Sequence, residues 1–211
     1  MQPMVNIALR AARQAGEMIV KAADNLESVE VSEKSKNDFV TEIDKRSEQI
    51  IIDSILKAYP DHHFLSEERG FDGNNSSDVQ WIIDPLDGTT NFVRGIPYVS
   101  VSIACMIKGK LEHAVVLEPF SHDEFTASRG FGAKLNGRRI RVSGKTDKNG
   151  ALYATGVPFN DPSFKHMKEY LKCLHEFVEN SCGVRRMGVA SLDLAYVCLL
   201  YTSPSPRDGH Q

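Results

Sequence analysis

Apolar side chains recur at helical spacing near the start of the chain. Between residues 4 and 23 they fall every three or four positions, which predicts an amphipathic helix. A polar stretch follows over residues 25–38. Isoleucines then repeat along one side of residues 41–59, and Pro60 comes directly after them. This pattern predicts a second helix that ends at Tyr59, because a proline disfavours helical geometry in the residue before it.

Short apolar or alternating runs dominate from residue 79 onward and predict strands. The runs cover residues 79–84, 99–107, 111–117, 124–127 and 151–155. Asn136-Gly137 is a hairpin signal, because both residues tolerate the positive φ that a tight turn requires. Helices are predicted over residues 164–180 and from about Ala190. The polar run at residues 66–78 is predicted to be a loop.

The composition changes near Lys145, where KTDKNG indicates a domain boundary. We expect an N-terminal α+β metal-binding subdomain over residues 1–145 and a partial C-terminal α/β subdomain over residues 146–198. Residues 199–211 contain a Ser/Pro tract that interrupts an apolar helix without a C-cap. A disordered native tail is one interpretation. We favour the other, in which this segment is not the native continuation of the chain.

Charge and cysteine content narrow the class of protein. The 211 residues are 41% hydrophobic and 25% charged, with 25 basic and 28 acidic side chains and a net charge of −3. This balance gives no indication of direct nucleic-acid or membrane-surface binding. The N-terminus lacks the apolar core of a signal peptide. Four widely spaced cysteines indicate reduced, mostly packed thiols of a cytoplasmic protein: Cys105, Cys173, Cys182 and Cys198.

Carboxylates form the most informative pattern, although each has a structural alternative. Asp44 lies three residues after Thr41, the spacing of a helix capping box, and Asp38 lies just upstream. Glu67 and Glu68 fit a solvated loop edge. Asp87-Gly88 fits an ordinary turn.

Taken together, these residues favour a different interpretation. Asp84 ends an apolar strand, and Pro85 keeps it extended at the place where open α/β sheets bind ligands. The turn that follows brings Asp87 back towards it and leaves the Leu86 carbonyl free. Carboxylate and carbonyl oxygens suit Mg²⁺. Residues 88–91, GTTN, favour a helix start that binds an anion, so the stretch predicts a magnesium-dependent phosphate site.

Three motifs closely resemble those of the inositol monophosphatase family: DFVTEID at 38–44, SEE at 66–68 and WIIDPLDGTTNF at 81–92. The likeness extends from the N-terminal helix to about Val197. It implies a layered α-β-α-β-α sandwich of the inositol monophosphatase / fructose-1,6-bisphosphatase type, with the second subdomain incomplete. It also implies a lithium-sensitive, Mg²⁺-dependent phosphatase of small phosphate monoesters, which is a homodimer at full length.

The resemblance assigns roles to individual residues. Glu67, Asp84 and the Leu86 carbonyl correspond to ligands of one Mg²⁺, and Asp84 and Asp87 to ligands of a second, among two or three ions per site. The residues that correspond to the catalytic set are Asp44, Glu67, Glu68 and Thr89. Those that correspond to the substrate-binding set are Asp87, Gly88, Thr89, Gly188, Val189 and Ala190.

This sequence departs from the family at two places. Val189 stands where the family has a small hydroxyl residue. The family's W-D-x-A-A-G segment, whose aspartate completes the second metal site, does not occur in this sequence. We therefore expect less activity than from a chain that carries the segment. We also expect an exposed apolar surface on residues 190–197, which lack strands to pack against.

The leading hypothesis is a phosphatase that acts on inositol monophosphate by attack of a metal-activated water. Other substrates stay open, namely fructose-1,6-bisphosphate, histidinol phosphate and adenosine bisphosphate. A non-catalytic role as a regulatory partner of RNA polymerase is the alternative from a different class.

Overall fold

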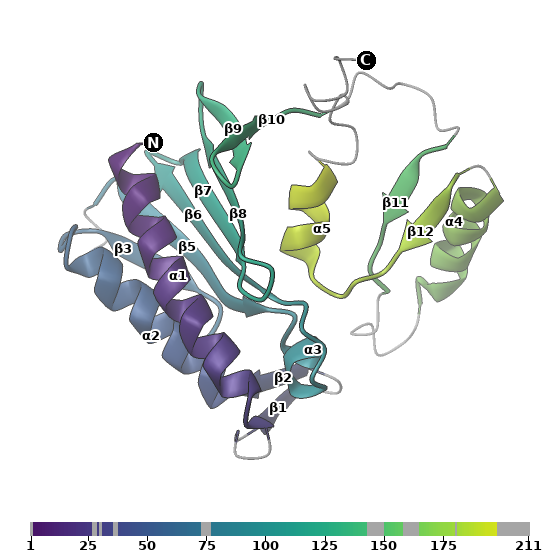
Figure 1. Cartoon of the computed structure of the whole chain (residues 1–211), viewed down its shortest axis with the longest axis horizontal. Coiled ribbons are helices and arrows are strands. Elements are labelled where there is room, and N and C mark those ends of the chain that lie inside the picture. The colour runs from purple at the N-terminus through teal and green to yellow at the C-terminus, as the bar shows by residue number, and fades with distance from the viewer. Residues whose placement is uncertain are drawn as a thin grey trace, which may run out of the picture.

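The computed structural model describes residues 2–26, 29, 31–35, 38–72, 77–142, 150–157, 165–179 and 181–197. A twisted sheet of eight strands forms its main body (Figure 1). In spatial order the strands are β10 (Arg138–Ile140), β9 (Gly132–Leu135), β8 (Asp123–Ser128), β7 (Lys110–Glu118), β6 (Ser100–Ile107), β5 (Val79–Asp87), β3 (His63–Ser66) and β4 (Gly70–Asp72). Among the described strands of this sheet only the β3–β5 pair is parallel, so these two strands run in the same direction and end side by side.

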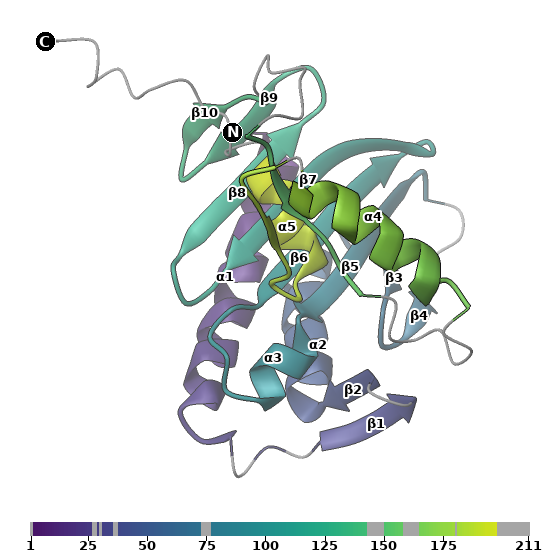
Figure 2. The same ribbon diagram turned by 90° about the vertical axis from the view of Figure 1, so that its right-hand side faces the viewer.

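Helices and a second sheet complete five layers (Figures 1 and 2). Helices α1 (Pro3–Ala23) and α2 (Glu42–Leu56) cover one face of the large sheet, and α5 (Ala190–Val197) covers the other. Beyond α5 lie the parallel strands β11 (Leu152–Ala154) and β12 (Gly183–Arg185), followed by α4 (Met167–Glu179). This order confirms the predicted α-β-α-β-α sandwich. A small hairpin of β1 (Val31–Ser35) and β2 (Asp38–Thr41) lies beside α3 (Thr89–Val93).

The main core lies between the sheet and the helices α1 and α2. On α1 the buried side chains are mostly small, which lets the helix lie close to the strands. At Gly16 a Cβ atom would come within 2.9 Å of the Leu117 side chain on β7. A smaller cluster on the opposite face consists of Phe125, Ile140, Val189 and Leu192, so α5 is anchored by its own apolar contacts.

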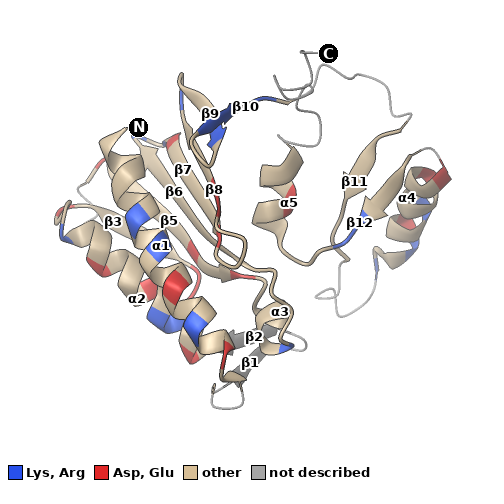
Figure 3. Ribbon diagram, in the orientation of Figure 1, with Lys and Arg blue, Asp and Glu red and all other residues tan. Residues whose placement is uncertain are grey.

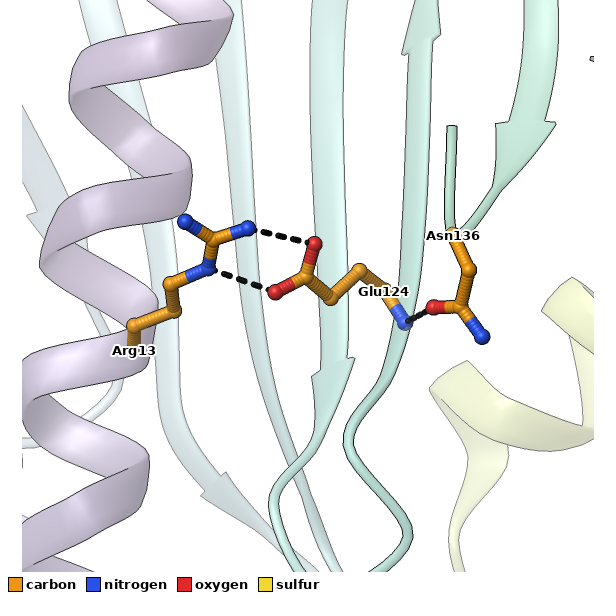
Figure 4. Close-up of polar contacts among 3 residues, drawn as sticks. All are labelled: Arg13, Glu124 and Asn136. Carbon is orange, nitrogen blue, oxygen red and sulfur yellow. Dashed lines mark hydrogen bonds and ion pairs between the residues drawn. The ribbon is translucent and has the colours of Figure 1, made fainter. Parts of the chain in front are cut away.

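Polar contacts attach α1 to strand β8 of the large sheet (Figure 4). Arg13 on α1 makes two hydrogen bonds to the Glu124 carboxylate on β8, at 2.5 and 2.7 Å. The Glu124 backbone N–H donates to Asn136 Oδ1 in the β9–β10 turn at 2.8 Å. Asn136 Nδ2 donates in turn to Asp123 Oδ1 at 2.9 Å. The hairpin predicted from Asn136-Gly137 is therefore present, and its turn is held against β8.

Most predicted elements are confirmed to within a few residues, but two polar stretches hide strands. Residues 25–38 contain β1 and the start of β2, and the predicted loop at 66–78 contains β4. These strands lack the alternating apolar pattern because they lie at the margins of the fold. The predicted boundary near Lys145 and the tail at 199–211 lie outside the described residues. None of the described helices is long and apolar enough to span a membrane.

Two packing predictions are corrected in part. Cys105 is buried, but Cys173 and Cys182 are exposed, so the described thiols are not mostly packed; Cys198 lies outside the described residues. On α5, Leu194 is 74% exposed as expected for an uncovered surface, whereas Leu192 is fully buried against the large sheet. The helix therefore has one packed side and one open side.

An aromatic cluster closes the end of the sheet that is remote from the carboxylates. Tyr59 stacks on His62 with ring centroids 4.7 Å apart. Trp81 Nε1–H donates to His62 Nδ1 at 3.0 Å. Because an indole N–H only donates, Nδ1 of His62 must carry no proton when this bond is made. Burial lowers the pKa of His62; the carboxylate of Asp61 opposes this shift and His63 adds to it.

We expect acid to weaken the fold through His62. Its folded-state pKa lies below the unfolded value near 6.5, so the unfolded chain binds the proton more readily. The contribution to stability is complete above about pH 6.5 and is lost as the pH falls below it. Thermal unfolding measured from pH 7.5 to 5 should show a smaller loss in His62→Gln, which keeps an acceptor but does not titrate. Identical pH profiles would contradict this account.

Candidate functional site

A bulge at the end of β5 brings its two aspartates together. Asp84 lies opposite Ser102 and Asp87 lies opposite Ser100 on β6, with an irregular register between them. The strand thus continues to Asp87, three residues beyond the predicted end. Without the irregularity, residues three apart would point to opposite faces of the sheet. The Leu86 N–H donates to Asp84 Oδ1 at 3.2 Å, which closes the turn.

A third carboxylate joins them because β3 ends beside β5. The Glu67 backbone N–H donates to the Ile83 carbonyl at 3.2 Å, so Glu67 follows directly on the parallel pairing of the strands. Burial raises the pKa of Asp84 to about 8, and the nearby charges of Asp87 and Glu67 add to the shift. Carboxylates crowded in this way repel one another, and a divalent cation would relieve the repulsion.

The donor chemistry fits Mg²⁺: hard oxygens from Glu67, Asp84 and Asp87, and a carbonyl at Leu86. In this conformation, however, the three carboxylates do not all lie within 4.8 Å of one another. Among the described residues, the one group of ligating side chains that meets this distance is His175, Glu176 and Glu179, exposed on α4. The predicted ligand assignment of the site at β5 therefore stays a prediction.

Asp44 serves both the helix cap and the site. The Thr41 N–H donates to its carboxylate at 2.8 Å, and Thr41 Oγ1 accepts from the N–H groups of Ile43 and Asp44, which completes the predicted capping box. Thr89 Oγ1 donates to the other carboxylate oxygen of Asp44 at 2.9 Å. Burial raises the pKa of Asp44, and hydrogen bonds from Thr41 and Thr89 counteract that rise. The predicted pair of Asp44 and Thr89 is thus in contact.

Gly88 allows a close approach that no other residue would permit. Its φ is +96°, a conformation that favours glycine, and it precedes the predicted helix start at Thr89. A Cβ atom on Gly88 would come within 2.8 Å of Val189 Cγ2. Val189 has no exposed surface, so in this conformation it packs on the turn, while Gly188 and Ala190 are exposed. Contact of these three residues with substrate stays a prediction.

Three hydrogen bonds that the sequence did not predict fix the start of α5 over this turn. Asp87 Oδ2 accepts from the Ser191 N–H at 2.7 Å. Asn91 Nδ2 donates to the Met187 carbonyl at 2.9 Å. The hydroxyls of Ser100 and Ser191 lie 2.6 Å apart. Asn91 lies within the quoted DPLDGTTN stretch, but nothing in the sequence pairs it with a residue 96 positions away.

A buried glutamate on α2 supports the turn that carries Glu67 and Glu68. Glu48 Oε2 accepts from the Glu68 N–H at 3.1 Å, and its other oxygen lies 2.9 Å from Arg69 Nε. Glu48 is fully buried, which requires such partners. The sequence does contain a signal for this contact. Glu48 lies among the isoleucines of the predicted helix, and a charge on an apolar face needs a partner.

The five-layer α/β sandwich is a fold of the inositol monophosphatase / fructose-1,6-bisphosphatase type. The chain belongs to the inositol monophosphatase family, whose model matches residues 1–200.

Similar proteins include two bacterial relatives named Nus factor SuhB. The one from Pseudomonas aeruginosa is 54% identical over 199 residues, which cover 93% of this chain and 73% of the relative. The one from Escherichia coli is 48% identical over 197 residues, with the same coverage.

Solved structures agree with this placement. The extragenic suppressor protein suhB of Bartonella henselae superposes with a TM-score of 0.87 at 38% identity, covering 93% of this chain and 74% of that one. The inositol monophosphatase of Thermotoga maritima superposes with a TM-score of 0.81 at 32% identity, covering 93% and 72%.

Gly88→Ala should lower the free energy of unfolding by about 1–3 kcal/mol, because the side chain meets both backbone strain and Val189. Gly109→Ala is the matched control, since Gly109 has φ +73° and open space around its Cβ position. Chemical denaturation measures both. Adding Val189→Ala to Gly88→Ala should recover the part of the loss that is due to the clash. Equal losses at the two glycines would show that the close approach is unimportant.

Asp84→Asn should stabilise the metal-free protein. The folded-state pKa of about 8 lies above the unfolded value of 3.8, so ionising Asp84 costs stability, increasingly as the pH rises from about 4 to 8. Asparagine removes this cost. The melting temperature at pH 7.5 should rise by about 2–4 °C for each kcal/mol gained. Mg²⁺ should raise the melting temperature of the parent but much less that of Asp84→Asn. A lower melting temperature for the variant without Mg²⁺ would contradict the repulsion.

Proposed function

We propose that this chain acts as a Nus factor of the SuhB type, a regulatory partner of the transcription machinery. The observation that carries this proposal is the 54% identity, over 93% of the chain, to a protein named Nus factor SuhB. A relationship this close over nearly the whole chain makes a shared role the simplest expectation. The regulatory alternative drawn from the sequence is therefore preferred to catalysis as the main role.

A second candidate function is the Mg²⁺-dependent hydrolysis of small phosphate monoesters, inositol monophosphate first among them. The crowding of Asp84, Asp87 and Glu67 favours it. Glu67, Asp84, Asp87 and the Leu86 carbonyl would hold the cation. When bound, Mg²⁺ would lower the pKa of a water molecule and neutralise charge on the phosphate.

The chain's own groups would position that water. Thr89 Oγ1 directs its proton towards Asp44 and towards the Leu86 carbonyl, at 2.9 and 3.0 Å. Its lone pairs are then available to accept a hydrogen bond from water, and Asp44 is available to take up a proton through Thr89. The backbone N–H groups of Gly88 and Thr89 would bind the phosphate oxygens.

One pair of variants separates the two functions. Thr89→Val removes the hydroxyl and keeps the shape, and should lower Mg²⁺-dependent phosphate release from inositol monophosphate by about 100-fold or more. Thr89→Ser keeps the hydroxyl and should retain most of the activity. Lithium should inhibit the parent. Both variants should raise terminator read-through by RNA polymerase, in the presence of other Nus factors, as the parent does.

Each result has a defined meaning. If the parent does not change read-through, the regulatory proposal is wrong. If Thr89→Val loses read-through together with phosphate release while Thr89→Ser keeps both, the regulatory role depends on catalysis. If the parent releases no phosphate under any of these conditions, the catalytic candidate is wrong and the regulatory one stands by itself.

A further inference from the structure

We propose that the β9–β10 hairpin binds single-stranded RNA. The segment from Arg129 to Val142, called here the basic hairpin, contains five cationic residues and no acidic one, in a chain whose net charge is −3. The five are Arg129, Lys134, Arg138, Arg139 and Arg141. Figure 3 shows the basic positions on β9 and β10, at one edge of the large sheet. The near-neutral composition of the whole chain conceals this local excess.

Most of this charge has no partner within the part of the chain that the structure describes. Arg129 pairs with Glu112 at 3.1 Å. The other four cations make no hydrogen bond or ion pair with any described residue. Glu124, the carboxylate on the adjacent strand β8, is already occupied by Arg13 (Figure 4). As far as the described residues go, the hairpin therefore presents four positive charges that no carboxylate pairs with.

The register of the hairpin places two of these charges directly opposite each other. Arg139 on β10 pairs with Lys134 on β9. Like charges in facing positions of an antiparallel ladder destabilise it. The Arg139 guanidinium also extends over Gly132, where a Cβ atom would lie 3.5 Å from it. An arrangement that costs stability at an exposed edge is expected where the charges serve binding.

A cavity of about 200 Å³ adjoins Lys134, one of these two cations. It lies where β8 and β9 meet the start of α1, and its lining includes Lys134, Phe131, Ser128, Thr126 and Gln2. Phe131 is 65% exposed. Single-strand recognition combines three features. Cations contact the phosphates, hydroxyl and amide groups bond the base edges, and an exposed aromatic ring stacks on a base.

Phe131 favours RNA over an acidic protein as the partner. An acidic peptide would use the four charges but would gain little from an exposed aromatic ring. A polynucleotide uses both, because every base offers a flat face. The hairpin is also preorganised, since Asn136 in its turn bonds to β8. RNA binding would extend the regulatory role proposed above. It rests on that role in one respect, namely that the RNA would be a transcript.

Fluorescence anisotropy with a labelled ten-nucleotide single-stranded RNA and the complete chain tests this proposal. Lys134→Gln/Arg139→Gln should weaken binding and reduce the slope of log Kd against log salt by about 1.4. Phe131→Ala should weaken binding by about 5- to 140-fold with little change in slope. Lys134→Arg/Arg139→Lys, which keeps the charge, should retain binding and so shows that loss in the glutamine variant is not misfolding.

Matched controls are available on other elements. Lys168→Gln/Lys172→Gln removes two exposed charges from α4, and Phe71→Ala removes an exposed ring from β4, the opposite edge strand of the same sheet. Both should bind RNA like the parent. The proposal is overturned if the controls weaken binding as much as the hairpin variants do. It is also overturned if a polyglutamate peptide binds more tightly than RNA and Phe131→Ala has no effect.

The outcome is separable from that of the proposed function. If the chain does not bind RNA but still raises terminator read-through, the proposal for the hairpin is wrong and the regulatory role stands. If the chain binds RNA through the hairpin but does not change terminator read-through, the regulatory proposal is wrong and the proposal for the hairpin stands.

Discussion

The approach of α5 to the turn at Gly88 is the contact on which the candidate site depends. The absence of a side chain at Gly88 lets Val189 lie against the turn, and this contact brings the Ser191 N–H to Asp87. The same turn holds Thr89 beside Asp44 at the start of α2. Groups from distant parts of the chain therefore meet because one backbone position is unobstructed.

The carboxylates that this close packing brings together repel one another. Asp84 and Asp87 lie near Glu67 at a partly buried strand end, and the fold retains them against an electrostatic cost. The packing of α1 and α2 on the large sheet stabilises the fold and offsets the electrostatic cost of this site. The family's carboxylates are thus present in a chain whose relatives include proteins named Nus factor SuhB. A cation site can contribute to folding and surface shape as well as to chemistry.

Sequence reasoning succeeds where the determinants are local. The carboxylates beside Gly88 lie within one short motif, and the capping box at Thr41 needs only a spacing of three residues. It fails where partners are distant: Ser191 lies 104 residues from Asp87, and no periodicity connects them. It also fails where register matters. The opposition of Lys134 and Arg139 depends on how β9 pairs with β10, which composition alone does not determine.

The attachment of α1 to β8 has a consequence for how the chain is made. Arg13 and Glu124 are 111 residues apart, and α1 also packs on β6 and β7. At about 5–20 residues per second, a ribosome needs about 5–20 s to synthesise the intervening chain. Until β6 and β7 have been synthesised, α2 is the only one of these partners available to α1, so its sheet-facing side stays uncovered. The nascent protein thus passes through a helical-pair stage in which it needs protection from aggregation.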